Sequence, residues 1–451
     1  MLALALTVSA CDGGVHGVPG GSGVRDPFFP KAGNGGYDVT HYALTLGYAP
    51  AGRRLTGTAV ITARATADLS AFDLDLAGLR VDSVTVDGKD ALVSRTGQEL
   101  TVRPHDDLGK GAVFRTTVRY AGAPRTLTDP DGSEEGWLPT ADGALALGEP
   151  VGSMAWFPGN DHPSDKASYD LAVTVPKGLQ AVSNGELTGS DDHDGRTTYH
   201  WRTAEPMASY LATLAIGHYT ITRSTGPHGL PLLTAVDPEQ AKASAGVLAR
   251  LPEILAWEER TFGPYPFSSA GVIVDRPGDA GYALETQNRP VFPGAPETGT
   301  LVHELAHQWY GDSVTPRSWR DMWLNEGFAT YADWLYQEEH GGRSAQQIFT
   351  GLYDDRDDDA LWAFPPARPD GAAHVSDRPV YERGAMVLHK IRQQTGDRAF
   401  KALLRGWAAA HRHGGASTAD FTAYVEKRAP GTDFTGIWKH WLYGDGRPDR
   451  P

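Results

Sequence analysis

The pattern of apolar residues changes once along the chain, near residue 222, and this change restricts what the chain can fold into. Upstream, short runs such as His41–Leu46 and Phe114–Tyr120 alternate apolar and polar residues, which predicts strands with one buried face. Asp87-Gly88, at the end of another such run, is typical of a tight hairpin turn. Downstream, apolar residues recur at helical spacing. The sequence therefore predicts an α+β protein, with an N-terminal antiparallel β domain followed by a mostly helical domain.

The predicted domain organisation follows from this change and from the turn-rich segment Thr222–Pro231. A signal-like segment at 1–11 and a Gly-rich, flexible tether at 12–34 precede the β domain, 35–224, and the helical domain, 225–451. Helices are expected at about 237–260, 298–310, 325–339, 380–395, 398–412, 418–428 and 433–443, and a strand near 271–275. The first helix is expected to begin with Asp237 as its N-cap.

Composition excludes several classes of protein. The chain has 41 basic and 56 acidic residues, a net charge of −15, and an acidic surface repels nucleic acid. No run reaches the roughly 18 consecutive apolar residues that a membrane-spanning helix needs. The single cysteine, Cys11, forms no disulfide within the chain.

Cys11 ends the apolar segment 1–11, and Val8-Ser9-Ala10-Cys11 resembles the lipobox at which bacterial lipoproteins are cleaved and acylated. The positively charged start of a secretory signal is missing, so the true start codon is a further open question. We expect an extracytoplasmic protein, either attached to the outer face of a bacterial cell membrane through a lipid on Cys11 or secreted. The alternative is an incidental cysteine in an unstructured N-terminus.

His303-Glu304-Leu305-Ala306-His307 is an H-E-x-x-H sequence within the expected helix 298–310. Side chains four residues apart lie on one face of a helix, so both imidazoles can bind the same Zn²⁺ ion. Glu304 lies beside that site without having to bind the metal. The helix is otherwise apolar, and burying these polar side chains is unfavourable unless they are paired or bound to metal. The pattern predicts a zinc site.

Glu326 supplies the third ligand in this prediction. Zinc hydrolases commonly have three protein ligands and keep the fourth position for water. Eighteen residues separate His307 from Glu326, which opens the next expected helix. A scheme with a third histidine six residues after the second fails, because Ser313 stands there and Tyr310 replaces the required glycine. The predicted ligands are His303, His307 and Glu326, with one Zn²⁺ per chain.

These motifs resemble the aminopeptidase N and leukotriene hydrolase type of gluzincin zinc metallopeptidases. The H-E-x-x-H, the eighteen-residue gap and Asn325–Ala329 match the zinc signature of that family. Trp156–Lys166 is similar to its W-F-P-x-x-D-x-P-x-x-K-A stretch, and Tyr381–Val387 to its Y-E-K-G segment. The resemblance spans most of 35–445 and implies a saddle-like β sandwich followed by a thermolysin-like catalytic domain.

The resemblance also implies catalytic roles. Glu304 would act as general base toward a water whose pKa zinc lowers to about 7. Tyr381, at the position of the family's catalytic tyrosine, would donate its phenol to the oxyanion. Many members of the family continue into a further helical domain, whereas we expect this chain to be a short, lipoprotein-like member without it and with a more open site.

Recognition of the substrate's free α-amine is the remaining role that the resemblance implies. Glu285, in Gly281–Gln287, takes the place of the glutamate in the family's G-x-M-E-N loop. Leu284 and Thr286 replace the Met and Asn of that loop, which leaves open whether exopeptidase action is enforced. Glu149 stands where the family has an amine-binding Gln.

The resulting hypothesis is a zinc metallo-aminopeptidase that hydrolyses the N-terminal bond of peptides with a free amine. Two alternatives remain open: an endopeptidase with the same zinc site, and a non-catalytic, zinc-stabilised peptide-binding lipoprotein. The presence of Glu304 and Tyr381 argues against pure binding, because binding needs neither.

Overall fold

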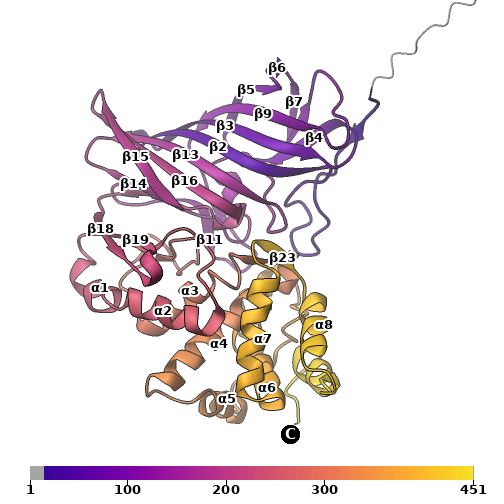
Figure 1. The fold of residues 1–451 in the computed structure, drawn as a ribbon. Coiled ribbons are helices and arrows are strands. Elements are labelled where there is room, and N and C mark those ends of the chain that lie inside the picture. The colour runs from indigo at the N-terminus through magenta and orange to yellow at the C-terminus, as the bar shows by residue number, and fades with distance from the viewer. Residues whose placement is uncertain (1–14, 450–451) are drawn as a thin grey trace, which may run out of the picture.

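The computed structural model describes residues 15–449 as a β-rich domain packed on a mostly helical domain (Figure 1). The α+β fold class predicted from the sequence is confirmed. The predicted signal segment 1–11, including Cys11, lies outside the described residues. Within 15–449, no helix has both the length and the apolar character needed to cross a membrane.

An eight-stranded sheet is the largest element of the β domain, with the order β15-β16-β13-β2-β3-β9-β5-β6. Its strands are β2 (Tyr37–Ala49), β3 (Arg54–Ala65), β5 (Arg80–Val86), β6 (Lys89–Asp90), β9 (Val113–Gly122), β13 (Lys166–Pro176), β15 (Glu186–His193) and β16 (Arg196–Ala208). The pair β2–β13 is parallel, whereas the other neighbours are antiparallel. β5 and β6 form the predicted hairpin, with positive φ at Asp87 and Gly88.

Two smaller sheets complete the β domain, with the orders β1-β4-β8-β7 and β10-β11-β12-β17-β14. Their strands are β1 (Val18–Pro19), β4 (Leu69–Asp75), β7 (Leu92–Thr96), β8 (Glu99–Arg103), β10 (Thr126–Thr128), β11 (Glu134–Pro139), β12 (Ala144–Leu147), β14 (Gln180–Ser183) and β17 (Leu214–Gly217). The turn between β10 and β11 reaches the helical domain, where it lines a cavity with residues of α3.

A four-stranded sheet of β18 (Thr220–Thr225), β19 (Pro231–Val236), β20 (Ala270–Val274) and β21 (Val291–Phe292) leads into the helical domain. β20 is the strand predicted near 271–275. Because β18 pairs with β19 along its whole length, this sheet begins at Thr220, a few residues before the boundary drawn from the sequence.

The single helix predicted for 237–260 is instead two helices, α1 (Ala241–Leu248) and α2 (Leu251–Phe262). Pro252 explains the break, because proline has no N–H for the preceding turn and its ring crowds the carbonyl four residues earlier. Asp237 does not cap the helix: it accepts a hydrogen bond of 2.8 Å from the Glu239 N–H in a turn ahead of α1.

The remaining helices are α3 (Thr298–Ala306), α4 (Trp323–Glu339), α5 (Ala345–Asp354), α6 (Gly384–Thr395), α7 (Asp397–Ala410), α8 (Thr418–Arg428) and the short α9 (Thr435–Ile437). Two short parallel strands, β22 (Val314–Pro316) and β23 (Gly414–Ala416), lie among them. α5 was not predicted, although its capping box of Ser344 and Gln347 is a sequence signal. α4 packs against α3 and α6 and is buried over most of its length.

Residues 26–29 join the two domains. The Asp26 carboxylate accepts hydrogen bonds from the Phe28 N–H at 2.8 Å, the Ser318 hydroxyl at 2.8 Å and the Trp319 N–H at 3.0 Å. The Phe29 ring contacts the Trp319 ring edge-on, with centroids 6.0 Å apart. This part of the chain is an ordered bridge, where the Gly-rich sequence of 12–34 predicts a flexible tether.

Candidate active site

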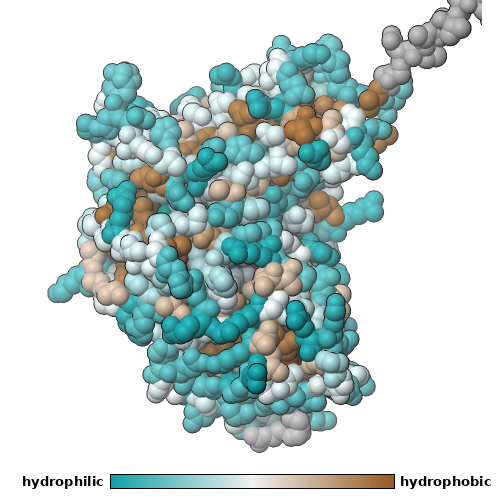
Figure 2. Space-filling model, viewed as in Figure 1, coloured by the Kyte–Doolittle hydropathy of each residue, from teal (hydrophilic) through white to brown (hydrophobic). Residues whose placement is uncertain are grey.

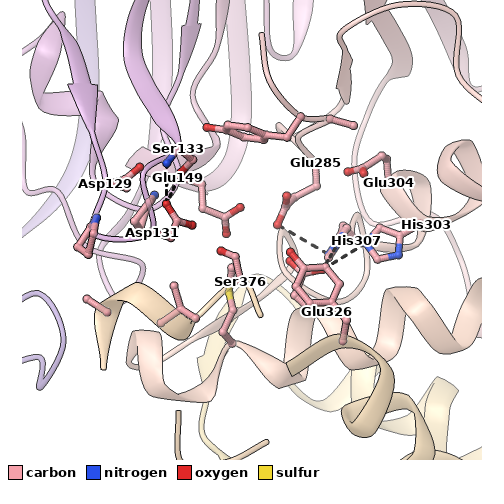
Figure 3. Close-up of a pocket in the computed structure, with 18 of the residues that line it drawn as sticks. Asp129, Asp131, Ser133, Glu149, Glu285, His303, Glu304, His307, Glu326 and Ser376 are labelled. Carbon is pink, nitrogen blue, oxygen red and sulfur yellow. Dashed lines mark hydrogen bonds and ion pairs between the residues drawn. The ribbon is translucent and has the colours of Figure 1, made fainter. Parts of the chain in front are cut away.

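A cavity of about 410 Å³ lies between the two domains, and both domains line it. Every residue that the sequence analysis selected contributes to its wall: Glu149, Glu285, His303, Glu304, His307, Glu326 and Tyr381. Figure 3 shows the labelled members of this set around a common space, with Glu149 toward the β domain and the two histidines on the opposite side.

Three potential ligand atoms converge at one end of the cavity, which we call the zinc end. His303 is in α3, His307 directly follows α3, and Glu326 is in the first turn of α4. The two Nε2 atoms are 3.1 Å apart, and Oε2 of Glu326 lies 3.2 Å from that of His303 and 3.4 Å from that of His307. Ligand atoms bound about 2.1 Å from one tetrahedral zinc ion are about 3.4 Å apart. The three side chains therefore fit a single zinc ion.

The hydrogen bonding of His307 supports this fit. Its Nδ1 lies 3.0 Å from the carbonyl oxygen of Tyr310 and donates its proton there, because a carbonyl only accepts. The other ring nitrogen, Nε2, is thereby directed toward His303 and Glu326. A hydrogen bond of this kind orients histidine ligands in metal sites.

The charges at the zinc end favour a cation. Burial lowers the pKa of His307, but the carboxylates of Glu285 and Glu326 raise it well above its ordinary value. Burial likewise acts against ionisation of Glu326, yet the two histidines lower the pKa of Glu326 to about 2. The surroundings thus stabilise positive charge between these groups, and a Zn²⁺ ion supplies it.

Glu304 lies beside the ligands, with 6% of its surface exposed. A carboxylate oxygen of Glu304 and potential ligand atoms of Glu285 and His307 lie within 4.8 Å of one another. Burial raises the pKa of Glu304 to about 8, while His307 acts in the opposite direction. A carboxyl group in this environment can accept and return a proton near neutral pH.

Tyr381 belongs to a π-helical turn, Pro379–Arg383, that leads into α6. Its ring is nearly parallel to the His303 ring, at 11°, with centroids 6.1 Å apart. Burial, followed by the charges of Glu326 and Glu149, raises the pKa of Tyr381 well above its ordinary value. The phenol therefore stays protonated and can donate a hydrogen bond at the zinc end.

Glu285 lies on the loop between β20 and β21, and this loop is fixed to the end of α3. The N–H of Leu284 donates to the carbonyl of Val291 at 2.9 Å, and Gln308 Nε2 donates to the carbonyl of Glu285 at 3.1 Å. The Glu285 side chain is buried, its Oε1 accepts no hydrogen bond, and this atom lies 3.8 Å from Nδ1 of His307. Burial raises the pKa of Glu285 to about 7.

The two loop residues that depart from the family pattern both support this loop. Leu284 is 1% exposed and packs in the core. The Thr286 hydroxyl donates to the carbonyl of Arg289 at 2.6 Å. The substitutions therefore coexist with an ordered loop that directs Glu285 into the cavity.

Glu149 reaches the cavity from the β domain. Carboxylate oxygens of Glu149, Glu285 and Glu326 lie within 4.8 Å of one another. The Oε1 atom of Glu149 is buried without a hydrogen-bond partner, and burial, followed by the charge of Glu285, raises the pKa of Glu149 well above its ordinary value. Carboxyl groups this close together favour a cation between them.

Several cavity residues were not found from the sequence. They are Phe29 of the ordered bridge, Met322 before α4, Val375 and Ser376 before the π-helical turn, and Asp129, Asp131 and Ser133 of the β10–β11 turn. The one available signal was Asp129-Pro130-Asp131-Gly132, which predicts a turn. It carries no information on what the turn faces.

Taken together, the fold and the site define a class of protein: a two-domain metalloprotein whose helical domain presents the His₂Glu ligand set of zinc hydrolases. A model of the peptidase family M1 domain matches residues 295–441, and a model of the peptidase M1 N-terminal domain matches residues 39–211. The chain belongs to the peptidase M1 family, as the resemblance in its sequence implied. The cofactor of this family and of the solved structures below is zinc.

Curated relatives of the chain are aminopeptidases. It is 27% identical to glutamyl aminopeptidase of Bos taurus over 62% of this chain and 32% of the relative. It is 25% identical to aminopeptidase 2 of Candida albicans over 82% of this chain and 43% of the relative. It is 26% identical to probable aminopeptidase 1 of Saccharolobus solfataricus over 84% of this chain and 50% of the relative. The chain thus spans about a third to a half of the length of these relatives.

Solved structures match the chain over nearly its whole length. A mutant M1 zinc metallopeptidase of Deinococcus radiodurans, bound to a Tyr-Ser-Ala substrate, is 29% identical with a TM-score of 0.87 and covers 95% of this chain and 99% of its own. A two-domain M1 zinc metallopeptidase mutant bound to L-arginine is 30% identical with a TM-score of 0.86 and covers 94% and 98%.

Proposed function

We propose that this protein is a zinc-dependent aminopeptidase that removes the first residue from peptides with a free α-amine. The observation that carries the proposal is the placement of Glu149 and Glu285, whose carboxylate oxygens lie within 4.8 Å of the potential zinc ligand Glu326. An ammonium group held by the two glutamates brings the first peptide bond to the zinc end. The aminopeptidase names of the relatives and the peptide bound to a similar structure support the same function.

His303, His307 and Glu326 would hold the zinc ion, which when bound would lower the pKa of a water to about 7 and would polarise the substrate carbonyl. Glu304 accepts the proton of the attacking water and later delivers it to the leaving amine. The protonated phenol of Tyr381 donates a hydrogen bond to the oxyanion of the tetrahedral intermediate. Each of these groups lines the same cavity.

Glu149 and Glu285 restrict cleavage to the end of a peptide. Both have a buried oxygen without a hydrogen-bond partner, and a buried carboxylate is unfavourable until a cation pairs with it. A free ammonium group supplies that cation, whereas an acetylated amine does not. The cavity therefore favours substrates with a free first residue.

The experiment is hydrolysis of aminoacyl anilides with free or acetylated amines, with and without a chelator, alongside measurement of bound metal. The proposal predicts one zinc ion per chain, chelator-sensitive turnover of free-amine substrates, and loss of turnover on acetylation. Equal cleavage of acetylated substrates would indicate an endopeptidase. Peptide affinity with bound zinc but without turnover would indicate the non-catalytic binding protein.

We also propose that the protein is extracytoplasmic and held at a bacterial membrane by a lipid on Cys11. The support is the lipobox-like Val8–Cys11 alone. Radiolabelled palmitate fed to the bacterium of origin should label the protein, and Cys11→Ser should abolish the label and release the protein from the membrane fraction. A membrane-bound, unlabelled wild type would contradict this proposal.

A further inference from the structure

The cavity holds more negative charge than zinc and an ammonium group can offset. Its lining includes the carboxylates Asp129, Asp131, Glu149, Glu285, Glu304 and Glu326, and no lysine or arginine among the described residues 15–449 lines it. A divalent metal ion and one substrate ammonium group offset only half of this formal charge. Two of the six carboxylates, Asp129 and Asp131, have no role in the proposed function.

Asp129 and Asp131 occupy the end of the cavity away from the zinc ligands. Both are on the turn between β10 and β11, and Figure 3 shows them beyond Glu149 as seen from His303. The first residue of a bound peptide has three groups that need a position in the cavity: its carbonyl, its amine and its side chain. Its carbonyl goes to the zinc end and its amine to Glu149 and Glu285, so its side chain is left to fill the space toward this turn.

The turn holds its carboxylates in a fixed position. The N–H of Asp129 donates to the carbonyl of Ser133 at 2.9 Å, and the N–H of Gly132 donates to the carbonyl of Asp129 at 2.9 Å. Pro130 restricts the backbone, and Gly132 has the positive φ of 90° that such a turn requires. Oδ1 of Asp131 accepts from the Ser133 N–H at 2.9 Å and from its hydroxyl at 2.6 Å. The side chain is therefore oriented before any ligand arrives.

Asp129 is the second carboxyl that this turn places in the cavity. The residue is 8% exposed, and its Oδ2 atom is buried without a hydrogen-bond donor. Its neighbour Glu135 is also a buried carboxyl, which accepts from the Val151 N–H at 3.1 Å. Burial raises the pKa of Asp129 to about 6 and that of Glu135 well above its ordinary value, and the two carboxyls share a hydrogen bond. A positive group in the cavity would stabilise the ionised form of Asp129.

Tyr282 adds an aromatic surface at the same place. It lines the cavity, and its hydroxyl is buried without a hydrogen-bond partner. Burial, followed by the charges of Glu135 and Glu149, raises the pKa of Tyr282 well above its ordinary value, so the ring stays neutral. Arginine and lysine side chains pack on such rings through cation–π contacts.

We infer that the β10–β11 turn, through Asp131 and Asp129, binds a positively charged side chain of the first residue, so that peptides beginning with arginine or lysine are the preferred substrates. The inference rests on the proposed aminopeptidase function. It adds a substrate class that neither the zinc ligands nor the two amine-binding glutamates specify.

The test compares arginyl, lysyl and norleucyl anilides, because norleucine has a long unbranched side chain without charge. For the wild type, kcat/KM for arginine and lysine should exceed that for norleucine by roughly ten- to a hundredfold, as expected for charge-assisted hydrogen bonds. Asp131→Asn should reduce the arginine-to-norleucine ratio of kcat/KM about tenfold. Asp131 is exposed at a turn, so this change does not threaten folding.

Asp194→Asn is the matched control. Asp194 is an exposed aspartate on the turn between β15 and β16, with a positive φ of 49° that asparagine also adopts. It removes the same charge from the same domain without touching the cavity, and the arginine-to-norleucine ratio should stay at the wild-type value. A ratio near one in the wild type, or an equal fall of the ratio in both variants, would overturn the inference.

Binding to an inactive enzyme separates this inference from the proposed function. Calorimetric titration of zinc-loaded Glu304→Gln with argininamide and norleucinamide should give at least tenfold tighter binding of argininamide. Equal affinities would overturn the inference even if anilides are cleaved. If no anilide is cleaved, the proposed function fails, and tighter binding of argininamide would still support cation recognition by this turn.

Discussion

At the zinc end of the cavity the potential metal ligands come from two consecutive helices, α3 and α4, whereas at the opposite end the carboxylates come from turns of the β domain. At the zinc end, one zinc ion bound by the two histidines would balance the charges of Glu304 and Glu326. The opposite end has Asp129, Asp131 and Glu149 and no basic side chain among the described lining residues. Catalysis at the zinc end needs balanced charges at fixed spacing. Recognition at the opposite end leaves negative charge for the substrate to neutralise.

The outer surfaces of the two domains differ in their exposed apolar side chains. Figure 2 shows hydrophilic side chains over most of the visible face of both domains, with apolar patches scattered among them, many in the β domain. The exposed large apolar side chains are Val15, Val18, Val24, Leu92, Val93 and Val113, all in the β domain or the segment before it.

The largest effect is expected at the zinc end. Glu304→Gln keeps the size of the side chain but removes the proton acceptor, so kcat should fall by about 10²–10⁴-fold. Bound zinc should remain at one per chain, as measured by atomic emission. Normal turnover in this variant would refute the general-base role.

Tyr381→Phe should have the next largest effect. It keeps the ring that lies against His303 but removes the oxyanion donor, so kcat should fall by about 10²–10³-fold with KM nearly unchanged. Steady-state kinetics with a free-amine anilide measure both. A rise in KM at constant kcat would instead assign Tyr381 to substrate binding.

Glu285→Gln tests amine binding between the two ends of the cavity. The variant loses one charge-assisted contact with the α-amine, so kcat/KM for a free-amine anilide should fall by roughly ten- to a hundredfold. Glu186→Gln, at an exposed position on β15, is the matched control and should behave as the wild type. If kcat/KM for the free-amine anilide stays at the wild-type value in Glu285→Gln, Glu285 does not bind the amine.

The last prediction concerns stability rather than catalysis, at the place where the two domains join. Burial alone would raise the pKa of Asp26, but hydrogen bonds from His162, Phe28, Phe29 and Ser318 hold it well below its usual range. Asp26→Asn should lower the free energy of unfolding by about 1.5–3 kcal/mol at pH 7, because a charged acceptor is lost. The depressed pKa makes this stability present above the unfolded value near 4 and lost as the pH falls below it.

Thermal melts of wild type and Asp26→Asn from pH 7 to pH 3 measure this effect. The gap between the two melting temperatures should be full at pH 5 and above and should narrow below pH 4. A gap that is constant with pH would show that the ionised form of Asp26 does not stabilise the interface.

The zinc end could be predicted from the sequence because its geometry is local. Helical periodicity places His303 and His307 on one face, and one loop separates them from Glu326; the structure brings their ligand atoms within 3.4 Å of one another. Tyr381, Glu285 and Glu149 required the family resemblance, because no spacing rule connects them with α3. The cavity includes all of them.

The opposite end could not be predicted, because its residues meet only through the packing of two domains. Asp131 and His303 are far apart in the sequence, and the turn motif of 129–132 does not indicate which residues the turn faces. The glycine content of 12–34 predicts a flexible tether for Phe29, because the hydrogen bonds that Asp26 makes with Ser318 and Trp319 form only in the folded structure. Such contacts depend on the tertiary structure rather than on local propensity.

The most direct test of the account is the position of the metal. Crystals of the zinc-loaded protein, measured on either side of the zinc absorption edge, should show one anomalous peak per chain within about 2.2 Å of Nε2 of His303, Nε2 of His307 and a carboxylate oxygen of Glu326. A fully occupied peak elsewhere, or a metal-free protein that cleaves free-amine anilides at the same rate, would contradict it.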